Sequence, residues 1–152
     1  MARNRLAREY KELVNSKDPE ISLSLDGETF DKWTATIAGP PDSPYVDFLF
    51  KLAVTCDAQY PMHPPKIRFL TRVFHPNMHF ETGEICLDIL KPEEWSPAWS
   101  LMSACRAVIS LLASPNADSP LNCDAGNLIR CGDLLGFASL ARYYCVELAQ
   151  PK

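Results

Sequence analysis

The residues most able to do chemistry lie in one irregular segment, residues 73–99. It holds a cysteine, Cys86, with a carboxylate two residues later, Asp88, and an amide nine residues earlier, Asn77. Three prolines and Gly83 interrupt the segment, so it fits neither a regular helix nor a regular strand. Its apolar and aromatic residues argue against disorder. We therefore predict an ordered loop that carries the active site.

Cys86 is the candidate nucleophile. An unperturbed thiol titrates near ~8.5, so a few per cent is already thiolate at neutral pH without a dedicated base. Asn77 is a candidate hydrogen-bond donor to the oxyanion of a tetrahedral intermediate, and losing such a donor costs roughly 3 kcal/mol. The alternative for Asn77 is that its side chain satisfies backbone groups of its own loop. The two roles are compatible.

Two other chemistries fit the segment less well. A thiol hydrolase needs a histidine to activate the thiol and to protonate the leaving group, and no Cys–His–Asn order is apparent around His63, His75 and His79. A zinc site could use His75, His79 and Cys86, but a proline–asparagine pair separates the two histidines and no fourth ligand has a suitable spacing. We therefore predict no metal site.

The composition limits the class of protein. The chain has 152 residues, 47% of them hydrophobic and 22% charged, with a formal net charge of −4. These values predict one globular domain over residues 1–152 and give no reason to expect nucleic acid as a partner. No apolar run reaches the length of a membrane span, and the charged first turns do not resemble a secretory signal. The six cysteines are therefore expected to be reduced, a pairing of Cys105 with Cys131 or Cys145 being the less favoured alternative.

The predicted fold class is α+β. Apolar residues at helical spacing predict a helix over residues 2–15, with a basic face that includes Arg5 and Arg8. Alternating apolar and polar residues with short, turn-rich connections predict four antiparallel strands. These strands are residues 21–25, 33–37, 48–54 and 67–69. After the active-site loop, Ser100 is expected to cap a helix to about residue 113, and two further helices follow. Those two are predicted over 124–131 and from 133 onward.

Five motifs in order along the chain resemble those of ubiquitin-conjugating enzymes. They are Tyr60-Pro-Met-His-Pro-Pro-Lys66, His75-Pro-Asn77, Gly83-Glu-Ile-Cys-Leu-Asp88, Trp95-Ser-Pro-Ala98 and Ser119-Pro-Leu-Asn122. The resemblance spans nearly the whole chain. It implies the ubiquitin-conjugating fold, with an N-terminal helix, a four-stranded antiparallel sheet, an active-site loop and C-terminal helices.

The resemblance also implies a reaction. Cys86 would accept ubiquitin from an activating enzyme as a thioester and pass it to a substrate with the help of a ligase. Only the activating enzyme would use ATP, and this chain would need no cofactor. Asn77 would be the oxyanion donor, His75 a support for its loop, and Asp88 a polar neighbour of the acceptor.

In this family the activating enzyme and RING-type ligases dock on the N-terminal helix and two loops. The residues that fall there are Arg5, Arg8, Pro61, Met62, Pro97 and Ala98. The alternatives are a simply solvated helix face and a Met62 that is buried in the core. The main alternative function is a non-catalytic scaffold of the same fold, which would form no thioester.

A narrower resemblance points to the peroxisome-biogenesis branch of the family. It rests on Lys91-Pro-Glu-Glu-Trp95, Trp99 and Asp124-Ala-Gly-Asn-Leu-Ile-Arg-Cys-Gly-Asp133. It implies a membrane-anchored peroxin that holds the enzyme at the cytosolic face of the peroxisome. It also implies a peroxisomal ligase and an import receptor that is ubiquitinated on a cysteine and recycled. The alternative is a general cytoplasmic enzyme that acts on lysines.

Ser119 stands where many members of the family carry an acidic residue beside the acceptor. A carboxylate there would help to deprotonate a lysine, whose pKa of ~10.4 lies above the ~8.5 of a thiol. We therefore hypothesise that transfer to cysteine is favoured over transfer to lysine, unless Asp118 replaces the missing carboxylate.

Overall fold

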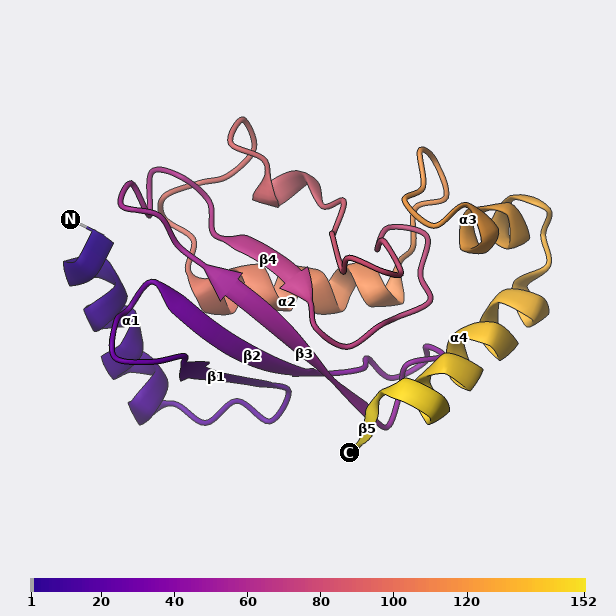
Figure 1. The fold of residues 1–152 in the computed structure, drawn as a ribbon, viewed down its shortest axis with the longest axis horizontal. Coiled ribbons are helices and arrows are strands. Elements are labelled where there is room, and N and C mark those ends of the chain that lie inside the picture. Colours follow the sequence, from indigo (N-terminus) through magenta and orange to yellow (C-terminus); the bar gives the residue numbers. More distant parts are fainter. Residues whose placement is uncertain (1) are drawn as a thin grey trace.

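The computed structural model describes residues 2–152 (Figure 1). Helix α1 (Ala2–Asn15) precedes the strands β1 (Ile21–Leu25), β2 (Lys32–Ala38), β3 (Phe48–Thr55) and β4 (Lys66–Phe69). The long loop after β4 contains a short 3₁₀ helix, η1 (Asp88–Leu90). The chain then forms the helices α2 (Leu101–Ala113), α3 (Cys123–Arg130) and α4 (Leu134–Leu148), and a two-residue strand, β5 (Gln150–Pro151).

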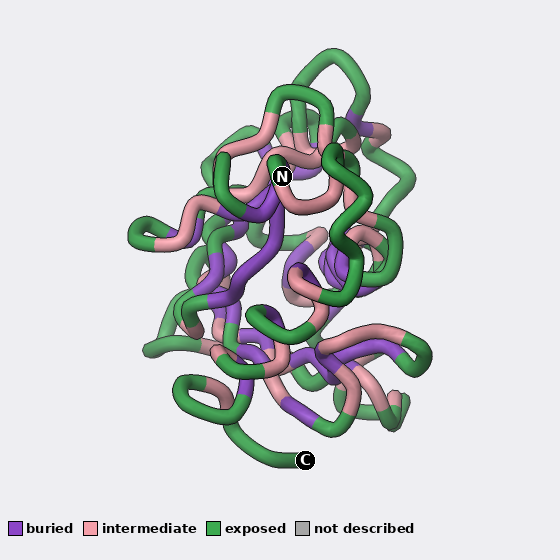
Figure 2. The backbone as a smooth tube through the Cα atoms, turned by 90° about the vertical axis from the view of Figure 1, so that its right-hand side faces the viewer, coloured by how far each residue is buried: buried purple, intermediate pink, exposed green. Residues whose placement is uncertain are grey.

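The four main strands form an antiparallel sheet in the order β1-β2-β3-β4. In β2, Trp33, Ala35 and Ile37 are buried while the threonines between them are half-buried, which is the alternation of a sheet with one face on the core. Helix α2 contacts β1 and β2 and so covers the inner face (Figure 1). Viewed from the side, the buried backbone runs through the middle of the molecule and the loops at its ends are exposed (Figure 2).

Helix α2 supplies the side of the core opposite the sheet. Ser100 caps it as predicted: the Ser100 hydroxyl accepts the Ser103 N–H at 3.1 Å, and the Ser103 hydroxyl accepts the Ser100 N–H at 3.3 Å. One face of the helix is buried against the sheet, including Leu101, Cys105, Val108 and Leu112. This helix therefore fixes the positions of the loops at both of its ends.

The predicted α+β fold class is confirmed, and the predicted element bounds agree with the structure to within a residue or two. Two details differ. The sheet has an additional strand, β5, which pairs with the start of β3 and is too short to show an alternating pattern. In α1, Tyr10 and Val14 are 38% and 64% exposed, so only part of the predicted apolar stripe is covered.

All six cysteines are free thiols, so neither alternative disulfide of Cys105 forms. Cys105 and Cys145 are buried, whereas Cys131 is exposed. Within residues 2–152, no helix has the length and apolar character needed to cross a membrane.

Candidate active site

Cys86 is positioned by the backbone of the His75–Met78 segment. The Cys86 N–H donates to the Asn77 carbonyl oxygen at 2.8 Å, and the preceding residue, Ile85, forms an isolated β-bridge with Met78. Cys86 is half-buried, and the 3₁₀ helix η1 begins two residues later. The loop is therefore ordered by hydrogen bonds although it forms no regular strand, as the sequence predicted.

His75 supports this loop from below. It is fully buried, its Nδ1 accepts the Asn77 N–H at 3.0 Å, and its Nε2 lies 2.8 Å from the Leu111 carbonyl oxygen in α2. Because a peptide N–H only donates and a carbonyl only accepts, the ring must be neutral with its proton on Nε2. Burial lowers the pKa of His75 to about 4, which agrees with that tautomer. This geometry suits a loop support and leaves no free nitrogen for a base or a metal ligand.

Asn77 links the Cys86 loop to the loop after α2. Its side chain is buried, with Nδ2 donating to the Asn116 carbonyl oxygen at 2.8 Å and Oδ1 accepting the Asn116 N–H at 2.9 Å. Asn77 therefore does satisfy loop backbone groups, but those of the loop after α2 and not those of its own loop. This pair of bonds uses one of the two N–H groups of the carboxamide, so the other is left for a transient oxyanion. The oxyanion role stays a prediction.

The loop over residues 116–122 is tied to the same segment by backbone bonds. The Pro76 carbonyl oxygen accepts the N–H groups of Leu121 at 2.8 Å and Asn122 at 3.1 Å. The Asn122 side chain then caps α3 by accepting the Ala125 N–H at 3.1 Å. The start of α3 and the Cys86 loop therefore hold each other in place.

Asp118 and Ser119 lie at the exposed tip of this second loop. Ser119 has a φ of 54°, a left-handed conformation that few residues other than glycine adopt readily. Behind the tip, Gly126 of α3 packs so closely on Pro120 that an added Cβ would lie 2.7 Å from the Pro120 Cγ. Both candidate acceptor-side residues thus belong to a loop fixed at each end, close in the chain to the residues that bond Pro76.

Asp88 is exposed at the start of η1, two residues from Cys86. Its carboxylate accepts a hydrogen bond from the Lys91 amine at 3.0 Å, and this contact raises the pKa of Lys91 above its ordinary value. Asp88 is therefore paired with Lys91, and its predicted role as a polar neighbour of the acceptor stays a prediction. The sequence reading did not single out Lys91, although its spacing of three residues from Asp88 is a visible signal.

The other cysteines differ from Cys86 in their surroundings. Burial raises the pKa of Cys56 and Cys105 to about 12 and that of Cys145 to about 11, so these thiols stay protonated. Cys123 and Cys131 are exposed at the two ends of α3. Cys86 is the thiol that escapes full burial and whose N–H is bonded to the backbone of the buried Asn77.

The predicted docking loops lie side by side. The Trp95 indole Nε1 donates to the Pro61 carbonyl oxygen at 2.8 Å, which joins the loop after β3 to the loop before α2. Met62 is 59% exposed, so its alternative burial in the core is wrong. Pro97 and Ala98 are exposed as well, whereas Pro61 is buried.

Helix α1 contributes to this surface in an unexpected way. Arg8 is exposed, but the alternative in which Arg5 belongs to a simply solvated face is wrong. The Arg5 guanidinium donates to the carbonyl oxygens of Pro97 at 2.8 Å and Trp99 at 2.6 Å. The sequence reading also missed Glu9, which is buried beside Arg5, because a glutamate in a charged helix resembles a solvated residue.

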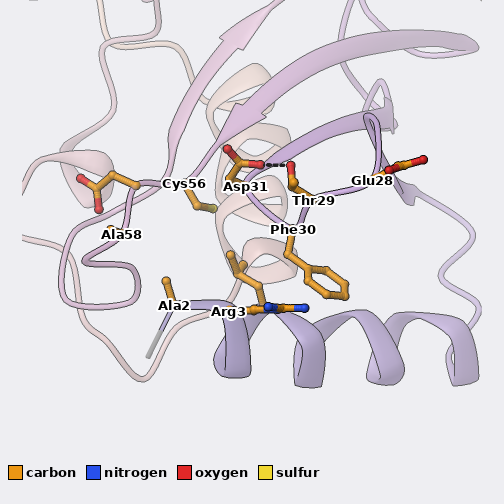
Figure 3. Close-up of a pocket in the computed structure, with 10 residues that line it drawn as sticks. Ala2, Arg3, Glu28, Thr29, Phe30, Asp31, Cys56 and Ala58 are labelled. Atoms are coloured by element: carbon orange, nitrogen blue, oxygen red, sulfur yellow. Dashed lines mark hydrogen bonds between the residues drawn. The ribbon is translucent and has the colours of Figure 1, made fainter.

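A cavity and a metal site are the other kinds of site that the fold could offer. A cavity of about 690 Å³ lies between the start of α1, residues 28–31 and residues 56–58, but no predicted site residue lines it (Figure 3). Among residues 2–152, no group of three or more histidine, cysteine or acidic side chains could hold a metal ion. Both findings leave the Cys86 loop as the candidate reaction site.

Comparison with known proteins gives consistent matches. Residues 5–144 match the family described as Ubiquitin-conjugating enzyme. The chain is 55% identical to Protein PEROXIN-4 of Arabidopsis thaliana over 153 residues, covering 99% of this chain and 97% of that protein. It is 53% identical to ubiquitin-conjugating enzyme E2 pex4 of Dictyostelium discoideum over 141 residues, covering 92% and 94%. A similar solved structure is H. polymorpha Pex4p in complex with the soluble domain of Pex22p, with a TM-score of 0.90, 35% identity and 98% of each chain covered.

Proposed function

We propose, because this chain belongs to the ubiquitin-conjugating enzyme family, that Cys86 is the residue on which it carries ubiquitin. The chain is a ubiquitin-conjugating enzyme, a transferase that works through a thioester intermediate. The observation that supports Cys86 is its position: its N–H is bonded to the Asn77 carbonyl, and it is flanked by two braced loops. Ubiquitin is the covalent cargo, and this chemistry calls for no other cofactor.

The reaction has two transfers. In the first, the Cys86 sulfur attacks the carbonyl carbon of the ubiquitin thioester on the activating enzyme, and that enzyme's thiol leaves. In the second, the acceptor attacks the new thioester, an oxyanion forms, and the Cys86 thiol leaves. The remaining N–H of Asn77 is our candidate donor to that oxyanion, held in place through Asn116. The neutral, enclosed His75 keeps the loop in shape and moves no proton.

A serine in place of Cys86 tests this assignment. In Cys86→Ser the hydroxyl would hold ubiquitin as an oxyester, which thiol reductants do not cleave but hydroxide does. We expect a reductant-resistant, alkali-sensitive adduct for Cys86→Ser, and a reductant-sensitive one for the wild type. The same stable adduct formed by a Cys123→Ser variant would contradict the assignment. A folded wild-type chain that forms no adduct would favour the non-catalytic scaffold.

The acceptor is proposed to be a cysteine more readily than a lysine. Ser119 offers no carboxylate, and Asp118 lies beside it at the same exposed loop tip. The test compares discharge of the preformed thioester to free cysteine and free lysine at matched thiolate and amine fractions. We expect the wild type to discharge faster to cysteine than to lysine. In Ser119→Asp the rate of discharge to lysine should rise, and adding Asp118→Ala should not reverse that rise. Comparable rates for both acceptors in the wild type would contradict the proposal and favour a general lysine-directed enzyme.

The activating enzyme and a RING-type ligase, which we propose to be peroxisomal, would dock on the two loops and α1. The supporting observation is that Met62, Pro97 and Ala98 are all exposed and lie on adjacent loops, with the exposed Arg8 on α1. Exposed apolar residues of this kind are typical of interaction sites.

A membrane-anchored peroxin is the proposed partner at the opposite, C-terminal end. The similar H. polymorpha protein was solved with the soluble domain of Pex22p. In this chain α4 exposes Leu135, Tyr143 and Val146 to 80%, 56% and 62%, an apolar surface that such a partner would cover. This partner would hold the enzyme at the cytosolic face of the peroxisomal membrane, with the import receptor as the substrate to be recycled.

Binding of the peroxin's soluble domain tests that surface. We expect Leu135→Glu and Val146→Glu each to weaken binding in calorimetry, because each buries a charge in an apolar contact. Val14→Glu is the matched control, since Val14 is 64% exposed on the distant helix α1 and should leave binding unchanged. Unchanged binding in both α4 variants would contradict the surface, and a purely cytoplasmic distribution of the enzyme would contradict the localisation.

A further inference from the structure

We propose that Arg5 and Glu9 of α1 are positioning residues, which hold the two docking loops in the shape that the activating enzyme and the ligase recognise. The proposal rests on the proposed docking surface of Met62, Pro97 and Ala98. It differs from the family expectation for the N-terminal helix, in which a basic residue such as Arg5 touches the partner. Here Arg5 acts on the partner only through the loops that it holds.

Glu9 is the centre of the arrangement. It is only 4% exposed, and both of its carboxylate oxygens are bonded. Oε2 accepts the Tyr60 hydroxyl at 2.6 Å and the Arg5 Nε–H at 3.1 Å. Oε1 accepts the N–H of Leu101, the first residue of α2, at 2.8 Å. An anionic group is stabilised there because the first N–H groups of a helix lack partners and carry partial positive charge. One carboxylate thus joins α1, the start of the first docking loop and the start of α2.

Arg5 extends this link to the second docking loop. Its two terminal nitrogens donate to the carbonyl oxygens of Pro97 and Trp99, the residues on either side of Ala98. Its guanidinium carbon also lies 5.9 Å from the centre of the Tyr60 ring. A planar guanidinium donates in fixed directions, so it sets both the position and the orientation of the loop.

The two docking loops are also bonded to each other, which closes a ring. Trp95 donates to the Pro61 carbonyl, and its ring packs edge-on against Trp99 with centroids 5.7 Å apart. This closed set of contacts therefore links α1 to residues 60–62, residues 60–62 to residues 95–99, and residues 95–99 back to α1. The exposed Met62, Pro97 and Ala98 project from it, so their spacing depends on bonds made by Arg5 and Glu9.

The composition of α1 explains why a charged pair is needed here. Leu6 is the fully covered apolar residue of this helix, while Tyr10 is 38% exposed and Val14 is 64% exposed. Apolar packing resists separation but fixes direction poorly, whereas charged hydrogen bonds are directional. A pair of apolar residues in place of Arg5 and Glu9 could hold the helix, but it would not orient two backbone carbonyls.

Steady-state charging by the activating enzyme tests the proposal in the full chain. We expect Arg5→Ala to raise the KM for this chain about tenfold while kcat changes by less than about twofold. We expect the KM of Glu9→Gln to lie between those of the wild type and Arg5→Ala. Its amide oxygen still accepts from Leu101 or Tyr60, but the neutral side chain no longer forms an ion pair with Arg5. Discharge of preformed thioester to free cysteine, which needs no docking, should be the same for all variants.

Arg8→Ala is the matched control, because Arg8 is exposed on the same helix. A direct charge contact weakens as salt rises, so the effect of Arg8→Ala should disappear at high ionic strength. The effect of Arg5→Ala should persist there, since it comes from a changed loop shape. An Arg5→Ala effect that also disappears with salt would overturn the positioning role.

A second readout does not depend on partners. Hydrogen exchange of the Leu101 amide should be faster in Glu9→Ala, which removes its acceptor, and exchange over residues 97–99 faster in Arg5→Ala, with both unchanged in Arg8→Ala. Unchanged exchange, or a KM for folded Arg5→Ala within about twofold of wild type, would overturn the proposal. Failure of the wild type to charge at Cys86 would instead overturn the proposed function and leave the exchange result valid.

Discussion

Two regions of the molecule hold distant loops together, and they use different side chains to do so. Tyrosine, tryptophan and cysteine aside, the buried polar or charged side chains among residues 2–152 are His75, Asn77 and Glu9. His75 and Asn77 lie against the Cys86 loop, are both neutral, and bond only to backbone groups. Glu9 lies under the docking loops and pairs with a cation, Arg5. Each set joins loops that are distant in the sequence.

The difference matches what each region must do. A charge fixed close to Cys86 would act strongly on the thiolate and on the oxyanion, because Coulomb interactions are weakly screened in a buried site. Neutral braces shape the loop without that effect. The docking loops have no reacting charge, so the stronger and more directional charged hydrogen bonds can be used there. We conclude that the buried ion pair lies under the docking loops and not in the Cys86 loop.

Glu9→Ala should have the largest effect on stability. It leaves Tyr60 and the Leu101 N–H without a partner and leaves Arg5 as an unpaired charge, so we expect a loss of about 3–5 kcal/mol in the free energy of unfolding. Urea denaturation measures it. Glu12→Ala is the control, since Glu12 is exposed on the same helix. A loss below about 1 kcal/mol would mean that Glu9 does not hold α1 and the docking loops together.

Asn77→Ala should have the next largest effect on stability. It removes both bonds to Asn116 and leaves the N–H and carbonyl of that partly covered contact unpaired, at a cost of about 1–3 kcal/mol. Transfer from the charged enzyme to its acceptor should also slow about 100-fold if the remaining N–H serves the oxyanion. Asn116→Ala is the matched control, because it keeps the backbone N–H and carbonyl that Asn77 uses and so should leave the brace intact. Equal effects of both substitutions would contradict the bracing role.

His75 predicts a pH effect of known sign. Its pKa is lowered on folding from 6.5 to about 4, so the unfolded chain binds more protons than the folded chain between these values. The stabilisation is complete above about pH 6.5 and falls as the pH drops towards 4, by roughly 3 kcal/mol in total. In His75→Gln the slope of the unfolding free energy with pH should be smaller over this window. An unchanged slope in folded His75→Gln would contradict this account of His75.

Lys91→Ala should have the smallest effect. Lys91 pairs with Asp88 at the surface, in contrast to the enclosed pair of Arg5 with Glu9, and exposed ion pairs contribute little to stability. The urea midpoint should therefore match that of the wild type. A clear loss would show that the charged contact beside Cys86 is structural, and the division between the two regions would then be weaker than we infer.

The same two regions show how far the sequence can be read. Ser100, the strand alternation and the punctuated Cys86 loop depend on neighbours in the chain, so local rules predicted them well. Cys86 and Asn77 were singled out because their side chains carry chemistry, and the structure bonds the Cys86 N–H to the Asn77 carbonyl. The resemblance to a known family supplied His75 as a loop support, and the structure shows which bonds it makes.

Glu9 and Arg5 illustrate what could not be read. The partners of Glu9 lie 51 and 92 residues away in the chain, and those of Arg5 lie 92 and 94 residues away. No periodic pattern reports such contacts, and an Arg–Glu pair one helical turn apart looks like an ordinary solvated pair. Burial of a charged pair follows from tertiary packing, which a single sequence does not display.

The most direct test of the account is a charging assay. Purified protein is incubated with activating enzyme, ubiquitin and ATP and run on gels with and without reductant, beside Cys86→Ala and a control, Cys123→Ala. We expect a reductant-sensitive ubiquitin adduct in the wild type and in Cys123→Ala, and none in Cys86→Ala. An adduct that survives in folded Cys86→Ala, or its absence from the wild type when the activating enzyme charges another carrier, would contradict Cys86 as the carrier.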